Sequence, residues 1–212
     1  MTGASSFARG IDVSKAQSTV AWPAVTGAGY VFAYIKATDG QDYVDPDFKL
    51  NWTGAAQAGL LRGAYHFFRA EDSPEVQADF FWNTVNGMGE GAGELPLVVD
   101  IEKNMDQTNS VVLSNLTAFL RDLERLSGRQ PMIYTYTSFW NGLGSGGFGN
   151  YPLWIAEYTT APAPILPHGW TTWQFWQHAQ DGKVSGITGD VDLNVFNGSA
   201  DELRQWAAQR RS

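Results

Sequence analysis

The segment from residue 95 to residue 126 reads LPLVVDIEKNMDQTNSVVLSNLTAFLRDLERL and predicts one strand followed by one helix. Its first part, Leu97 to Glu102, is an apolar, β-branched run typical of a buried strand. From Ser110 to Leu126 the leucines recur with the 3.6-residue period of an amphipathic helix, and Gly128 lies just past the end as a stop signal. A strand followed by a helix that packs back on the sheet is the repeating unit of an α/β fold.

The same pattern extends in both directions along the chain. Further strands are predicted at Gly10 to Ser14, Tyr30 to Lys36, Leu61 to Phe67, Met132 to Tyr136, Leu153 to Glu157, Thr172 to Trp176 and Val191 to Val195. Further helices are predicted at Phe48 to Ala58, at Pro74 to Val85 after the N-cap Ser73, and from the capping box Ser199/Glu202 to about Gln209.

Eight strands with about five helices, in a chain shorter than the roughly 250 residues of a regular (β/α)₈ barrel, predict an irregular TIM-like (β/α) barrel. An open doubly wound sheet is the second choice, but no G-x-G-x-x-G turn follows the first strand and no Walker A motif is present. The glycine-rich stretch at 144–149 is interpreted as a flexible loop at the rim.

Composition limits the classes of function. The 212 residues are 43% hydrophobic, which favours a single barrel domain over residues 9–212 behind a flexible N-terminal tail over residues 1–8. A net charge of −8 argues against nucleic acid as a partner. No apolar run approaches the roughly 18 residues of a membrane span, and the first ten residues lack the features of a secretory signal. With no cysteine, disulfides and thiolate metal sites are excluded.

Asp100 and Glu102 are the first candidates for chemistry. Residues two apart on a strand share a face, with Cα atoms roughly 6 to 7 Å apart, so both carboxyl groups should reach one bound molecule. Paired carboxyl groups at such separations cleave glycosidic bonds, although a solvated acid pair or a metal-ligand pair has the same spacing.

Polar and aromatic residues also occur where the other predicted strands end. In a barrel, the carboxyl ends of the strands meet at one mouth, which is where active sites of this architecture lie. The residues expected there are Asp12, Lys36, Tyr65, Asp100, Glu102, Tyr134, Trp154, Gln174 and Asp192. Four acids brought to one mouth favour catalysis over a solvated surface.

A series of motifs resembles the family 25 glycoside hydrolases, the Chalaropsis-type lysozymes. It consists of GIDVSxxQ at 10–17, YIKATxG at 34–40, GAYHF at 63–67, DIE at 100–102, LWIA at 153–156, WQF at 173–175 and VDLN at 191–194. The resemblance implies a barrel that cleaves the β-1,4 bond between N-acetylmuramic acid and N-acetylglucosamine in peptidoglycan. It also implies an acid cluster of Asp12, Asp100, Glu102 and Asp192. The sequence departs from the family at Asp39, where a glutamate is common.

Within that cluster, Glu102 is assigned as general acid because like-charged neighbours raise a carboxyl pKa. Asp100 would stabilise charge at the sugar carbon or orient the 2-acetamido group, and Asp12 and Asp192 would hold the geometry. Tyr65, Tyr134, Trp154 and Gln174 are candidates for substrate contacts, with core packing as the alternative for each. Lys36 could form an ion pair with one of the acids, and His66 is interpreted as a structural histidine.

No cofactor and no metal site is predicted, since the three histidines lack zinc-ligand spacing. Three other functions stay open: a metal-dependent hydrolase using the same acids, a non-catalytic glycan-binding barrel, and a chitin hydrolase. The expected partner is the glycan strand of bacterial peptidoglycan, with no nucleic acid and no membrane. We expect a monomer that acts on the cell wall, either secreted or released from the host cytoplasm at lysis.

Overall fold

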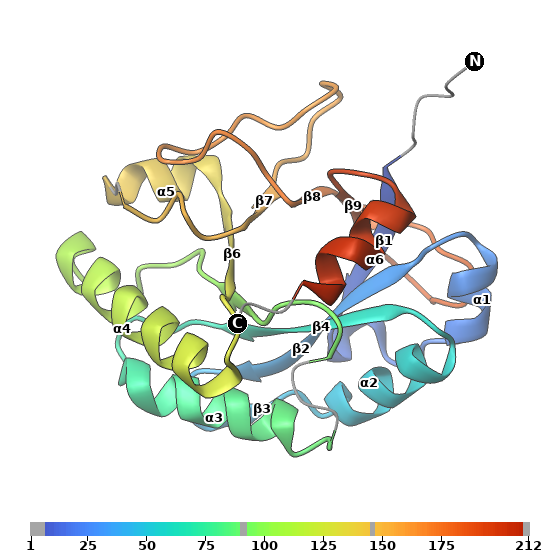
Figure 1. Cartoon of the computed structure of the whole chain (residues 1–212), viewed down its shortest axis with the longest axis horizontal. Coiled ribbons are helices and arrows are strands. Elements are labelled where there is room, and N and C mark those ends of the chain that lie inside the picture. The colour runs from blue at the N-terminus through green and yellow to red at the C-terminus, as the bar shows by residue number, and fades with distance from the viewer. Residues whose placement is uncertain (1–6, 90–92, 145–146, 210–212) are drawn as a thin grey trace.

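The computed structural model describes residues 7–89, 93–144 and 147–209, and its centre is a closed barrel (Figure 1). The strands form one nine-stranded sheet in the order β1-β9-β8-β7-β6-β5-β4-β2-β3, and β1 pairs with β2 as well as with β9. Eight strands therefore close the barrel, while β3 pairs with β2 outside it. The strands are β1 (Ala8–Val13), β2 (Phe32–Asp39), β3 (Tyr43–Val44), β4 (Leu61–Phe67), β5 (Val98–Asp100), β6 (Met132–Tyr136), β7 (Leu153–Ala156), β8 (Phe175–Gly182) and β9 (Val191–Phe196).

Strand β9 runs against the direction of the other barrel strands. Neighbours from β1 through β2 and β4 to β8 are parallel, whereas β9 is antiparallel to both β8 and β1. The carboxyl ends of the parallel strands therefore lie at the mouth together with the amino end of β9. Asp192 reaches the mouth from the start of its strand, where it pairs in register with Asp12, and not from a strand end as predicted.

Side chains alternate between the barrel interior and the outer layer, as the two-residue period of a strand requires. In β2, Phe32 and Tyr34 belong to the interior cluster, while Ala33 and Ile35 pack in the outer core beneath the helices. The lower interior is filled by aromatic rings, so that polar residues are confined to the mouth. Gly10 of β1 makes this filling possible, because a Cβ there would collide with the Phe32 ring.

Six α-helices are present in the described part of the chain. They are α1 (Trp22–Gly27), α2 (Phe48–Gln57), α3 (Pro74–Asn86), α4 (Asn109–Ser127), α5 (Thr137–Leu143) and α6 (Ala200–Ala208). Helices α3 and α4 lie side by side on the outside of the sheet (Figure 1). Within those residues, no helix has the length and apolarity needed to cross a membrane.

Helix α6 closes the bottom of the barrel. Leu203 is fully buried in the interior cluster, and the Trp206 ring packs on Phe175 and Phe196. Phe175 begins β8 and Phe196 ends the antiparallel β9, so both lie at the end opposite the mouth. The barrel is therefore a filled core with one open end.

The eight-strand barrel and the four predicted helices are present, with differences in detail. Strand β3 was not predicted, and β5 ends at Asp100, so Glu102 follows this strand and does not lie on it as predicted. Helices α1 and α5 had no sequence signal, since each is shorter than two turns. Strand β8 begins at Phe175, three residues later than predicted. Strand β1 begins at Ala8, inside the predicted tail, whose residues 1–6 lie outside the described residues, as do 145–146 of the predicted rim loop.

Candidate active site

A pocket of about 310 Å³ opens at the mouth of the barrel, and we call it the mouth pocket. The four predicted acids all line it: Asp12 from β1, Asp100 at the end of β5, Glu102 just after β5, and Asp192 from β9. Its other lining residues are Ser14, Lys36, Tyr65, Phe67, Tyr134, Trp154, Tyr158, Gln177 and Gln180. Eight of the nine predicted site residues therefore meet in one place.

Asp12 is fixed by two amide side chains. Its Oδ2 accepts hydrogen bonds from Gln177 Nε2 at 2.8 Å and from Asn194 Nδ2 at 2.7 Å. Asn194 is oriented in turn by Trp154, whose Nε1 donates to Asn194 Oδ1 at 2.8 Å. An oxygen that accepts two N–H donors has no room for a proton of its own, so this network favours the ionised form of Asp12.

Asp12 and Asp192 behave as one pair. Burial is the largest effect on Asp12 and raises its pKa, while hydrogen bonds from Asn194 and Gln177 oppose the rise. Burial and the charge of Asp12 raise the pKa of Asp192 to about 8. We assign the shared proton to Asp192 at neutral pH, because the two amides already occupy Asp12 Oδ2.

Asp100 and Glu102 form a second pair, whose pKa values are both raised. Burial followed by the charge of Glu102 raises the pKa of Asp100 well above its usual range, and Lys36 opposes this. Burial raises the pKa of Glu102, with Lys103 and Lys36 opposing. Such a pair can retain one proton near neutral pH, as a general acid requires.

Asp100 also offers an unused acceptor. It is 8% exposed, and its Oδ1 is buried without a hydrogen-bond partner among the described residues. Buried polar atoms are rarely left unpaired, and those that are tend to have a functional reason. Because the atom belongs to a pocket-lining side chain, a bound N–H donor would satisfy it.

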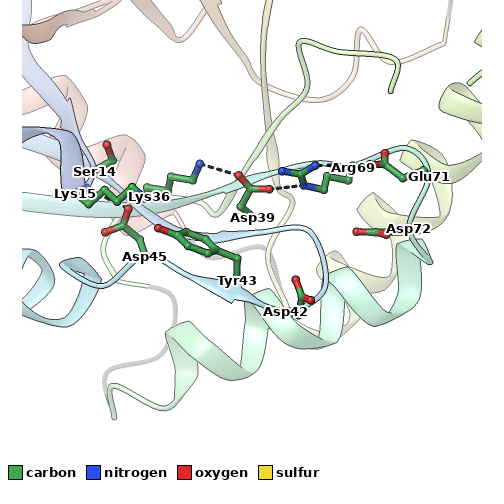
Figure 2. A pocket seen from close by; sticks show the side chains of 10 residues that line it. All are labelled: Ser14, Lys15, Lys36, Asp39, Asp42, Tyr43, Asp45, Arg69, Glu71 and Asp72. Atoms are coloured by element: carbon green, nitrogen blue, oxygen red, sulfur yellow. Dashed lines mark hydrogen bonds and ion pairs between the residues drawn. The ribbon is translucent and has the colours of Figure 1, made fainter. Parts of the chain in front are cut away.

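Lys36 does not pair with the acid cluster as predicted. Its Nζ forms an ion pair with Asp39 Oδ2 at 3.1 Å, and Arg69 Nε holds the other oxygen of Asp39 at 2.6 Å. Figure 2 shows Asp39 held between these two cations in a neighbouring pocket of about 580 Å³, which we call the charged pocket. Ser14 and Lys36 line both pockets, so the two are continuous.

The aromatic candidates reach the mouth pocket to different extents. Tyr134 and Tyr158 each donate a hydroxyl hydrogen bond to Gln177 Oε1, at 2.9 and 2.7 Å. Trp154 is 2% exposed and stacks on Tyr34, so most of its ring fills the barrel and only an edge is left for a ligand. Tyr65 packs edge-on against the same indole. These rings form the floor and wall of the pocket.

Gln174 is the predicted site residue that lies elsewhere. Its Oε1 accepts from the backbone N–H of Leu153, and its backbone carbonyl accepts from Asn197, both at the bottom of the barrel. The residue at the mouth is Gln177. The sequence TWQFWQ contains the Trp-Gln pair twice, at 173–174 and at 176–177, and the later start of β8 selects the second.

His66 faces away from the mouth. Its side chain is fully buried among the outer helices, stacked on Phe81 and Phe119, with Thr38 and Gln77 at its two ring nitrogens. Burial lowers its pKa to about 4, so it stays neutral and structural. Among the described residues, no group of three or more His, Asp or Glu side chains is placed to hold a metal ion.

Comparison with known proteins assigns the family. Residues 11–187 match the family model described as glycosyl hydrolases family 25. Lysozyme M1 of Streptomyces globisporus is 41% identical over 92% of this chain and 69% of its own length. The N,O-diacetylmuramidase of a Chalaropsis species is 32% identical over 94% of this chain and 98% of its own length.

A solved structure agrees with both. The crystal structure of the bacterial lysozyme from Streptomyces coelicolor superimposes with a TM-score of 0.86 at 39% identity, covering 95% of this chain and 97% of that one. The match therefore extends over nearly the whole barrel. On these grounds the chain belongs to glycosyl hydrolase family 25 and is a glycoside hydrolase.

Proposed function

We propose that this chain is a lysozyme, which hydrolyses the β-1,4 bond between N-acetylmuramic acid and N-acetylglucosamine in bacterial peptidoglycan. The observation that carries the proposal is the set of four carboxyl groups in one pocket, all with raised pKa values. Two pairs that each retain a proton supply both a proton donor and negative charge next to the sugar carbon that becomes cationic. The names of the lysozyme and diacetylmuramidase relatives support the choice of substrate.

Glu102 is the general acid in this proposal. Its side chain is less deeply buried than those of Asp12 and Asp100 and stands at the edge of the pocket, where a glycosidic oxygen can approach. It donates its proton to that oxygen as the bond to the muramic acid C1 breaks. The resulting carboxylate then accepts a proton from the water that completes hydrolysis.

Asp100 acts through the substrate's own acetamido group. Its unpaired Oδ1 is the acceptor for the acetamido N–H, and this hydrogen bond stabilises the ionised form of Asp100. The proton of the Asp100/Glu102 pair then rests on Glu102. The acetamido oxygen attacks C1 as the bond breaks, Asp100 stabilises the positive charge that develops on the nitrogen, and the product retains its anomeric configuration.

The test is the release of new reducing ends from purified peptidoglycan, with the sugar at each end identified. We expect the wild-type protein to release muramic acid ends and Glu102→Gln, with its fold checked by circular dichroism, to lose at least about 99% of kcat. Equal activity of the two proteins would remove Glu102 from the role of acid. Cleavage of chitin but not peptidoglycan would identify a chitin hydrolase, and loss of activity in chelator a metal-dependent enzyme.

In this proposal the enzyme acts on the cell wall, after secretion or after release at lysis. The monomeric state stays a prediction.

A further inference from the structure

A third pocket adjoins the mouth pocket on the side of β6, β7 and α5. Its lining is richer in aromatic and apolar side chains than that of the charged pocket. It has a volume of about 730 Å³, and we call it the aromatic pocket. Tyr136, Thr137, Asn141, Tyr158 and Ile165 contribute to its walls. Glu102, Tyr134, Tyr158 and Gln180 line both this pocket and the mouth pocket, so the two form one continuous trough.

The aromatic pocket presents apolar faces to solvent. Tyr136 is 36% exposed, Tyr158 50% and Ile165 68%, which are large fractions for such side chains. The charged pocket instead presents ion pairs, with Asp39 between Lys36 and Arg69 and with Asp42 and Asp72 beyond them (Figure 2). Aromatic faces with nearby amide and hydroxyl groups suit the apolar face of a pyranose ring and its polar rim.

Glu102 stands on the border between the mouth pocket and the aromatic pocket. Of the four acids, Asp12, Asp100 and Asp192 line the mouth pocket, and Glu102 lines the aromatic pocket as well. A general acid must contact the glycosidic oxygen, which is bonded to both sugars. The bond that Glu102 protonates therefore crosses this border, with one sugar on each side of it.

The acids also decide which sugar lies on which side. The sugar that becomes cationic at C1 needs negative charge beside it, and Asp12 and Asp100, the ionised members of the two pairs, supply that charge in the mouth pocket. The sugar that leaves with the protonated oxygen must then lie across the border, away from those charges.

We propose that the aromatic pocket is the binding site for the leaving-side N-acetylglucosamine and the sugar beyond it, and that this fixes the direction of the glycan strand. The reducing end of the strand lies over α5, and the non-reducing end lies toward the charged pocket. This inference rests on the proposed function, because the roles of the acids set the direction.

Paramagnetic NMR can read the direction without turnover. Glu102→Gln would be titrated with a tetrasaccharide of alternating N-acetylglucosamine and N-acetylmuramic acid that carries a nitroxide on its reducing end. We expect broadening of the amide signals of Asn141 and Ile165, with those of Asp42 and Asp72 unchanged, and the opposite pattern when the nitroxide is moved to the non-reducing end. Broadening at Asp42 and Asp72 by the reducing-end label, or at neither pair once the sugar is bound, overturns the proposal.

Kinetics on peptidoglycan provide a second measurement. Tyr136→Ala removes an exposed ring and should lower kcat/KM by about three- to tenfold, whereas Tyr136→Phe keeps the ring face and should stay within about twofold of wild type. Equal losses in both variants would mean that the ring face binds no sugar. If the wild-type protein releases no muramic acid ends at all, it is the proposed function that fails, and the NMR result still reports where the sugar lies.

Discussion

Gln177 connects three other side chains at the mouth. It donates to Asp12 and accepts from both Tyr134 and Tyr158, so that a single amide group orients an acid and two aromatic walls. Since its N–H stabilises a buried negative charge, its loss is more costly than the loss of a surface hydrogen bond.

Gln177→Met should therefore reduce kcat on peptidoglycan by about 10- to 100-fold, because a charge-assisted hydrogen bond of this kind contributes about 1.5 to 3 kcal/mol. Loss of the donor raises the pKa of Asp12, so the acidic limb of the pH profile should move to higher pH. Gln174→Met is the matched control, since it makes the same change at the barrel bottom and should leave kcat unchanged. A Gln177→Met enzyme with wild-type kcat at every pH would show that Asp12 does not need this donor.

Asp39 fixes the position of the Lys36 ammonium group through their ion pair. Its own charge raises the pKa of Asp100, while Lys36 lowers the pKa of Asp100 and of Glu102. The ion pair with Asp39 keeps the ammonium group from binding the acid cluster directly.

Asp39→Asn removes the negative charge and releases Lys36, and both effects lower the pKa of the Asp100/Glu102 pair. The proton needed for catalysis is then lost at lower pH, so the alkaline limb of the kcat profile should move downward in pH. Asp39→Glu keeps the charge and should keep the wild-type limb. A limb unchanged in Asp39→Asn would mean that Lys36 stays in place without its partner.

At the scale of elements, capping residues and hydrophobic periodicity were sufficient to predict the long helices. The direction in which a strand runs through the barrel could not be predicted. The Ser73 cap and the Ser199/Glu202 capping box are both formed, at the starts of α3 and α6. By contrast, nothing local in the β9 sequence states that it runs antiparallel, because side-chain alternation is the same in either direction. The position of β8 was also mispredicted, because the Trp-Gln pair occurs twice and nothing local in the sequence indicates which copy lies in the strand.

The acid cluster itself was predictable because each acid lies on a strand or just after one, beside an apolar run, and barrel closure brings these positions together. What sequence could not supply was the partner of each side chain. Lys36 could have paired with any acid at the mouth. It is the position of β4, and of Arg69 two residues beyond the end of that strand, that places Asp39 between the two cations.

Helix α6 carries a testable structural role as the lower plug of the barrel. Leu203→Ala should lower the free energy of unfolding by about 2–5 kcal/mol, since it leaves a cavity in a fully buried site. Urea denaturation measures the loss, and the exposed neighbour Gln205→Ala is the control, with an expected change below about 0.5 kcal/mol. Because the plug lies far from the mouth, kcat well below the unfolding transition should be unchanged. A loss below about 1 kcal/mol would mean that the barrel interior is stable without this contact.

For the whole molecule, the acid cluster that the proposed catalysis needs lowers the free energy of unfolding at neutral and higher pH. A carboxyl group whose pKa is raised by folding binds its proton more tightly in the folded state. Stability from this source is therefore greatest below the unfolded pKa and declines as pH rises toward the folded value. For Asp192 that window extends from its ordinary range near 3.8 up to about 8.

Asp192→Asn is neutral at every pH and should remove this decline. We expect the variant to be more stable than wild type at pH 8, with the difference vanishing as the pH falls to about 4, and to be less active throughout. Urea midpoints at several pH values, with unchanged slopes, are the measurement. A constant stability difference across this pH range would show that Asp192 keeps an ordinary pKa in the folded protein.

The closed lower end of the barrel also determines where a tag, a support or a fused protein can be joined to this enzyme without covering the active site. Strand β1 rises from that end, and α6 follows the last strand there, so both ends of the described fold lie on the side opposite the mouth. An affinity tag, a resin linkage or a fused carrier protein joined before Ala8 or after α6 would leave the trough facing outward. Immobilised by either end, the molecule would present its open face to an insoluble substrate.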